Sequence, residues 1–167
     1  NKMGLSNTSL PQNEALKKRY GEVNPPTKGP WNDVVGAILS HRSVRSYTTE
    51  KLPDFTLETL IAAAQSAATS SNMQVWSVVS TTDPDKKKEL AKIAGGQKHI
   101  EQCPLFLVWL ADLSRNERLG KEEGVEMVVN PYVETFLVAA IDAALAAQNA
   151  VVAAESLGIS TVYIGAM

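Results

Sequence analysis

The sequence contains little that would build a disulfide scaffold, a metal centre or a nucleic-acid surface. Its single cysteine, Cys103, cannot form an internal disulfide, which is typical of cytoplasmic proteins. No HExxH, paired CxxC, GxGxxG or GxSxG motif is present, so zinc, Rossmann and serine-hydrolase chemistry have no support. The formal net charge is −2 and no basic stripe runs along the chain. We therefore expect no metal and no nucleic-acid partner.

Long uninterrupted apolar runs are also missing. The most apolar stretch, residues 136–157, is interrupted by polar side chains, among them Asp142 and Glu155. We interpret it as a buried helix rather than a membrane span. Residues 1–16 lack the continuous apolar segment of a signal peptide. What remains, with 44% hydrophobic and 20% charged residues among 167, is typical of a soluble globular domain. We expect a cytoplasmic protein that does not bind membranes.

The chain divides into an arm, residues 1–30, and a domain, residues 31–167. The arm is polar and proline-rich, with one possible helical turn around residues 14–20. After Trp31 the apolar residues take helical spacing, and we expect a helix capped by Asn32 or Asp33 that ends near Ser40. A second helix is expected to take Thr56 as its cap.

The rest of the domain alternates helices and strands. Asp83 and Pro84 are expected to open one helix, and a long alanine-rich helix over residues 134–157 should end at Gly158 in the left-handed conformation. Three strands are expected, over residues 75–81, 104–111 and 160–164. The second is apolar throughout, as in a strand covered on both faces, so we expect it in the middle of a sheet. This pattern without repeats predicts an α+β fold class.

Four stretches combine residue types that bind ligands. His41, Arg42, Ser43 and Arg45 lie directly after a helix end, and two guanidiniums with an imidazole and a hydroxyl suit an anionic, oxygen-rich ligand. Taken alone, this stretch is more simply interpreted as surface charge ending a helix.

The second stretch, residues 69–76 (TSSNMQVW), offers neutral donors and acceptors that suit a ring with carbonyls and ring nitrogens, although an ordinary loop would look the same. The third, residues 95–99 (GGQKH), and the fourth, residues 163–166 (YIGA), contain glycines that let a ligand approach the backbone. Each alone is an ordinary turn or strand end, and His99 is expected to be structural.

In their order along the chain, these stretches resemble the nitroreductase family, in the branch of oxygen-insensitive NADPH nitroreductases and NADPH-flavin oxidoreductases. The resemblance runs from Trp31 to Met167, and its longest motif is AAQNAVVAAESLGISTVYIGAM, residues 146–167. It implies an α+β sandwich, a central sheet flanked by helices, in a homodimer with FMN at its interface. It also implies ping-pong hydride transfer from NADPH through flavin N5 to a nitroaromatic, quinone or flavin acceptor, without a catalytic side-chain acid or base.

Carried over residue by residue, the resemblance places His41, Arg42 and Ser43 at the FMN phosphate and ribityl chain. It places Arg45 beside the pyrimidine edge of the flavin, where a cation stabilises the charge gained on reduction.

The same resemblance implies that the partner subunit supplies Thr69, Ser70 and Met73, and that Gln97 hydrogen-bonds flavin or ribityl oxygens. It implies further that the face or edge of the ring is lined by Tyr163, Ile164, Gly165 and Ala166, with the Gly165 amide near flavin N5.

Two departures from the family pattern stand out. Ala166 occupies a position where glycine is usual in this branch, which narrows the space beside the ring. Family members also continue well past the position of Met167, with further phosphate-binding cations, an arm around the partner and contacts to NADPH. We therefore expect that the native polypeptide continues and that exposed apolar surface marks the place of the missing part.

Three alternatives stay open at this point. The first is a flavin-binding or flavin-storage protein without enzymatic activity, which NADPH would not bleach. The second is an inactive truncated product. The third is a family member with specialised oxidative chemistry, such as flavin fragmentation or dehydrogenation.

Overall fold

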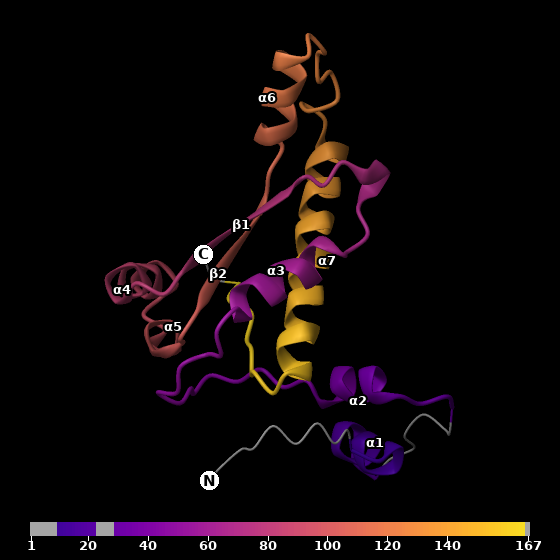
Figure 1. Cartoon of the computed structure of the whole chain (residues 1–167), viewed down its shortest axis with the longest axis vertical. Helices are drawn as coiled ribbons and strands as arrows, with labels where there is room; N and C mark the ends of the chain where they lie inside the picture. The colour runs from indigo at the N-terminus through magenta and orange to yellow at the C-terminus, as the bar shows by residue number, and fades with distance from the viewer. Residues whose placement is uncertain (1–9, 23–28, 166–167) are drawn as a thin grey trace. The chain divides into compact units, whose positions relative to one another are not determined.

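The computed structural model describes residues 10–22 and 29–165, which fall into two compact units (Figure 1). Unit 1 comprises Asn1–Arg45 and Val151–Tyr163, and unit 2 comprises Ser46–Ala150 and Ile164–Met167. The division into an arm and a domain at residue 30 stays a prediction.

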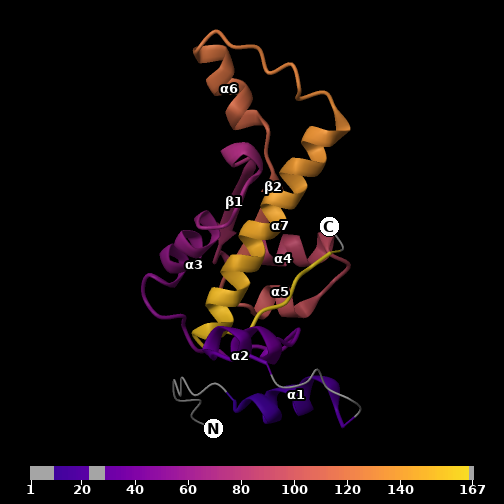
Figure 2. The same ribbon diagram turned by 90° about the vertical axis from the view of Figure 1, so that its right-hand side faces the viewer.

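Unit 1 is built on two short helices, α1 (Gln12–Tyr20) and α2 (Asp33–Ser40). They lie side by side in both views (Figures 1 and 2). The side chain of Asn32 accepts a hydrogen bond from the Val35 amide at 3.0 Å, which confirms the expected cap of α2. The end of α2 at Ser40 is also as expected.

Unit 2 begins with α3 (Thr56–Gln65) and the single turn η1 (Ser70–Asn72). The expectation that Thr56 caps α3 is wrong. Thr56 is the first helical residue, and its hydroxyl donates to the Pro53 carbonyl at 2.7 Å. Phe55 stands at the cap position in the left-handed conformation, with φ of 62°. The Thr56 hydroxyl faces backwards along the chain, so it satisfies a carbonyl rather than a helical amide.

The strands β1 (Trp76–Thr81) and β2 (Phe106–Ala111) pair antiparallel, with Trp76 opposite Ala111 and Thr81 opposite Phe106. The expectation that β2 lies in the middle of a sheet is wrong for the described residues, where the sheet has two strands and β2 becomes exposed towards Ala111. An apolar run indicates that a strand can be covered, but it does not say which neighbours cover it.

The expected strand over residues 160–164 is not formed in the described structure. The Val44 amide donates to the Thr161 carbonyl at 3.0 Å, but this contact does not develop into a ladder. The β-branched residues of this segment therefore favour a strand without being sufficient for one.

Three further helices flank the strand pair. They are α4 (Pro84–Ile93), α5 (Lys98–Gln102) and α6 (Ser114–Glu122). As expected, Asp83 caps α4, and its carboxylate accepts from the Asp85 amide at 2.9 Å. Figure 1 shows α4 and α5 at one end of the strand pair and α6 beyond the other. A hydrophobic core forms where α4 and α5 meet β2, and its buried members are Ala91, Ala94, Ile100, Cys103 and Phe106.

The long helix α7 (Val133–Ser156) runs close to the expected bounds, and Gly158 follows it with φ of 77°, as expected. Most of its alanines are buried, while bulky apolar residues along it are exposed: Phe136, Leu137, Ile141 and Leu145. By length and by a mean hydropathy of 1.7, α7 meets the minimum for a membrane-crossing helix. This indication is weak, because core helices of soluble proteins meet the same minimum.

Candidate functional site

The candidate residues fall in both units. Unit 1 holds the cationic stretch after α2, which ends at Arg45, and also Tyr163. Unit 2 holds the loop around η1, Gln97 before α5, and the segment Ile164–Gly165. Ala166 lies outside the described residues.

In unit 1 the largely buried carboxylate of Glu155 contacts the first candidate stretch and a residue just before the fourth. His41 Nδ1 lies 2.7 Å from Glu155 Oε1, and the Thr161 hydroxyl donates to the same oxygen at 2.8 Å. The Val44 amide donates to the Thr161 carbonyl, so backbone and side-chain contacts join the same segments. Sequence reasoning missed Glu155 as a site residue, although a carboxylate inside an apolar helix was a visible signal.

The two arginines of this stretch have different surroundings. Arg42 donates to the His41 carbonyl at 2.7 Å and to the Lys18 carbonyl near the end of α1 at 2.9 Å. Arg19 of α1 also donates to the His41 carbonyl, at 3.1 Å. The Arg42 guanidinium is therefore already used in contacts with the backbone, one of them at the negative end of α1.

Arg45 is exposed, and within the described residues its guanidinium has no hydrogen-bonding or ionic partner. The Ser43 hydroxyl is likewise exposed and unpartnered in the described part of the chain. With His41, whose Nδ1 is engaged by Glu155, these groups supply a cation, a hydroxyl and an imidazole Nε2 within five positions. Such a donor set fits a phosphate and a polyhydroxyl chain.

Tyr163 is half-buried in the same unit. Burial raises the pKa of its phenol, and the nearby negative charge of Glu155 raises it further. Tyr163 therefore stays a neutral phenol at physiological pH.

In unit 2 the loop around η1 has an uncommon backbone. Ser71, Asn72 and Gln74 all have positive φ, at 50°, 54° and 52°. Non-glycine residues rarely adopt this left-handed conformation, and several close together indicate a backbone that its surroundings hold in place.

Contacts from two helices hold this loop. At its start, the Ser70 amide donates to Oδ1 of the buried Asp142 on α7 at 3.1 Å. At its end, Asn116 of α6 donates to the Met73 carbonyl at 2.9 Å, and the Arg115 guanidinium donates to the Gln74 carbonyl. Thr69, Ser70 and Met73 therefore lie on one fixed turn.

The GGQKH stretch forms the turn after α4 and the first residues of α5. Gly95 and Gly96 have φ of 78° and 81°, and Gln97 donates its side-chain amide to the Ala94 carbonyl at 2.8 Å. The Gln97 side-chain oxygen is left as an acceptor. His99 has a buried Nε2 without a hydrogen-bond partner in the described structure.

The segment after Tyr163 has two different environments. Ile164 packs its side chain against the hydrophobic core formed by α4, α5 and β2. Gly165 is exposed, and a Cβ added there would meet nothing within 4 Å. A ligand at this segment would therefore contact the backbone of Gly165 rather than the Ile164 side chain.

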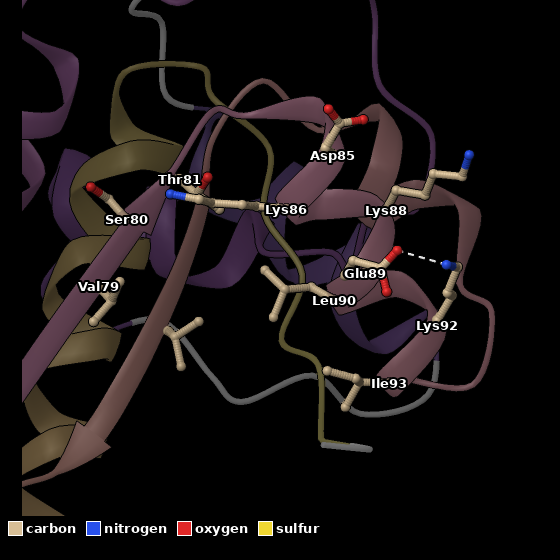
Figure 3. Close-up of a pocket in the computed structure, with 11 residues that line it drawn as sticks. Val79, Ser80, Thr81, Asp85, Lys86, Lys88, Glu89, Leu90, Lys92 and Ile93 are labelled. Atoms are coloured by element: carbon tan, nitrogen blue, oxygen red, sulfur yellow. Dashed lines mark hydrogen bonds and ion pairs between the residues drawn. The ribbon is translucent and has the colours of Figure 1, made fainter.

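Unit 2 also has an open hollow of about 640 Å³ between β1 and α4 (Figure 3). Its walls combine apolar side chains such as Val79 and Ile93 with lysines, and Lys92 pairs with Glu89 at 2.6 Å. None of the candidate residues lines this hollow. Among the described residues no cluster of His, Cys, Asp and Glu could hold a metal ion.

Residues 38–167 match the sequence profile described as the Nitroreductase family. The chain belongs to the nitroreductase family. The resemblance inferred from the sequence is thereby confirmed.

Individual relatives in the nitroreductase family agree with this placement. The FMN reductase (NADPH) of Bacillus subtilis is 44% identical over 137 residues, which make up 80% of this chain and 54% of that protein. The oxygen-insensitive NADPH nitroreductase of Salmonella typhimurium is 38% identical over 128 residues, 77% of this chain and 51% of that protein.

A solved structure confirms the α+β fold class. The NfrA1 nitroreductase from B. subtilis matches with a TM-score of 0.76 and 43% identity, covering 80% of this chain and 54% of that one. The present chain thus spans about half the length of the nitroreductase relatives that it matches.

Proposed function

We propose that this protein is an FMN-dependent NADPH oxidoreductase that passes electrons to a nitroaromatic, a quinone or free flavin. The observation that carries the proposal is the stretch His41–Arg45 in a chain of the nitroreductase family. It offers an oriented imidazole, a hydroxyl, and the Arg45 guanidinium, which has no partner among the described residues. The names of the relatives, an FMN reductase and an NADPH nitroreductase, support the choice of cofactor and reductant.

The donor set favours FMN over FAD. His41, Arg42 and Ser43 would face the phosphate and ribityl oxygens, with charge-assisted hydrogen bonds that match phosphate geometry. Arg42 would first have to exchange its contact with the Lys18 carbonyl for one with the phosphate. The chain has no GxGxxG motif for an adenine dinucleotide, so a mononucleotide suits it better.

The remaining candidates would position the ring. Gln97 would offer its side-chain oxygen to the flavin or ribityl chain. The face or edge of the flavin ring would be lined by Tyr163, Ile164, Gly165 and Ala166. Thr69, Ser70 and Met73 would be contributed to the site of the partner subunit. Each of these assignments rests on the resemblance to the family.

Bound FMN would supply the hydride-carrying chemistry, in which NADPH is oxidised in one half-reaction and the acceptor is reduced in the other. Arg45 would place a positive charge at the pyrimidine edge and stabilise the reduced state. Tyr163 would keep its proton, since its pKa is raised. No side chain needs to act as an acid or base.

We also propose that the protein is a cytoplasmic homodimer. The exposed bulky residues of α7, from Phe136 to Leu145, form an apolar surface of the kind that an obligate interface covers. The single, buried cysteine suits a reducing compartment.

An absorbance spectrum of the full-length protein tests this proposal. We expect a bound flavin spectrum that NADPH bleaches and an added quinone or nitroaromatic restores, with FMN released on denaturation. A protein that binds FMN but is not bleached by NADPH would be a flavin-storage protein instead, and a protein that binds no flavin would refute the proposal outright.

A further inference from the structure

We propose that Glu155 is a positioning residue for the cofactor site: it fixes the tautomer of His41, so that the unprotonated Nε2 of the imidazole accepts a hydrogen bond from a ribityl hydroxyl of FMN. The inference rests on the proposed function, because it assigns a partner to a residue of the same site. It concerns a carboxylate of α7 that lies outside the stretch His41–Arg45.

The geometry decides which imidazole nitrogen is committed. His41 Nδ1 lies 2.7 Å from Glu155 Oε1. An ionised carboxylate has only acceptors, so the hydrogen of this bond must be carried by Nδ1. With the hydrogen on Nδ1, Nε2 keeps its lone pair and is the nitrogen that remains to accept from a hydroxyl of a ligand.

The carboxylate is itself held in place. The Thr161 hydroxyl donates to the same Glu155 Oε1 at 2.8 Å, and the side chain of Glu155 is only 12% exposed. Two donors on one oxygen restrict its rotation, and low exposure reduces competition from water. His41 is more open, with 33% of its side chain exposed, as a group that must also reach a ligand should be.

The backbone strengthens this arrangement. The Val44 amide donates to the Thr161 carbonyl at 3.0 Å, three residues after His41. Thr161 therefore holds Glu155 through its hydroxyl and the candidate stretch through its carbonyl.

The chain offers a direct measurement, because it contains two histidines in all, His41 and His99. Nitrogen-15 NMR of the imidazole rings reports which nitrogen carries the proton, and a His99→Gln variant assigns the signals. We expect the Nδ1–H tautomer for His41 in the unmodified protein. Glu155→Ala should lose it in favour of Nε2–H, whereas Glu155→Gln should retain it, because the amide oxygen still accepts.

Affinity for FMN gives the second readout. Glu155→Ala should weaken FMN binding by about tenfold, because the released imidazole no longer presents Nε2 as an acceptor and the bond from the ribityl hydroxyl is lost, and Glu155→Gln should restore most of the affinity. Thr161→Val removes the hydroxyl that holds Glu155 but keeps the backbone carbonyl, so it should give a smaller loss of FMN affinity. This variant tests the proposal if Glu155→Ala does not fold. Ser156→Ala is the matched control, because within the described part of the chain the Ser156 hydroxyl donates only to the Ala153 carbonyl of its own helix.

The two proposals fail in different ways. If the unmodified protein binds no FMN, the proposed function is refuted, and the inferred role of Glu155 at the cofactor falls with it. If FMN binds tightly but Glu155→Ala and Thr161→Val leave both the His41 tautomer and the FMN affinity unchanged, the role of Glu155 alone is overturned.

Discussion

The carboxylate of Asp142 accepts a hydrogen bond from the amide of Ser70, 72 positions earlier in the chain, with 3.1 Å between Oδ1 and nitrogen. Asp142 is 1% exposed, and its Oδ2 has no partner in the described structure. Burying a carboxylate in an apolar helix costs free energy of folding. We infer that Asp142 is kept because it anchors the loop around η1. The loop in turn holds Thr69 and Met73 in place.

Replacing Asp142 by alanine should destabilise the protein by roughly 1–3 kcal/mol, because the Ser70 amide is left without an acceptor. Asp142→Asn should cost less, since the amide oxygen can still accept. Chemical unfolding measures both changes. Asn149→Ala is the control, because it removes contacts from α7 to Ala63 and Ser66 but leaves the loop untouched. Equal stability of Asp142→Ala and the unmodified protein would contradict the anchoring role.

Replacing Arg45 by alanine should weaken FMN binding and slow reduction by NADPH, since a cation beside the reduced ring contributes on the order of a few kcal/mol. Arg45→Lys should recover part of both, because it keeps the charge but loses the planar fork. Stopped-flow reduction and a flavin titration measure the two effects separately. Arg45 has no partner among the described residues, so thermal stability should be unchanged. Unaltered reduction kinetics would show that Arg45 does not face the ring.

Asp112 should make stability depend on pH. Hydrogen bonds from Ser114 and then Ser77 lower the pKa of its carboxyl from 3.8 to about 2. Because the folded pKa lies below the unfolded one, this contribution is present above about pH 4 and is lost as pH falls towards 2.

The matching variant is Asp112→Asn, which should be less stable than the unmodified protein at neutral pH. The gap between the two should shrink as the pH falls through this window. Unfolding midpoints of both proteins, measured between about pH 7 and pH 2, test this expectation. A stability difference that widens on acidification would contradict it.

Placing a charge on the exposed apolar surface of α7 should break the proposed dimer. Leu137 and Ile141 are 53% and 57% exposed, and an unpaired carboxylate in a covered interface is strongly unfavourable. Ile141→Glu should therefore give monomers in sedimentation, together with loss of bound FMN. Leu119→Glu on α6 is the control, since Leu119 is similarly exposed but lies outside α7. Dimers that survive Ile141→Glu would place the interface elsewhere.

The sequence by itself determined the features that depend on neighbouring residues. The cap at Asn32 and the start of α4 at Asp83 and Pro84 follow from side chains that bond to amides two or three positions away. Gly158 ends α7 because a left-handed residue there needs no distant partner. Family membership was also visible, because long motifs carry it in the residue order alone.

The tertiary structure decided whatever depends on residues far apart in the chain. That Glu155 binds His41 and Asp142 binds Ser70 could not be inferred from spacing, since both bonds join side chains or amides across long separations. Thr56 is a residue type that caps helices, yet its hydroxyl bonds to the Pro53 carbonyl instead. Residues 160–164 have the composition of a strand, yet they form one contact with Val44 and no ladder. Local patterns show what a residue can bind, and only the folded chain decides which partner comes within hydrogen-bonding distance.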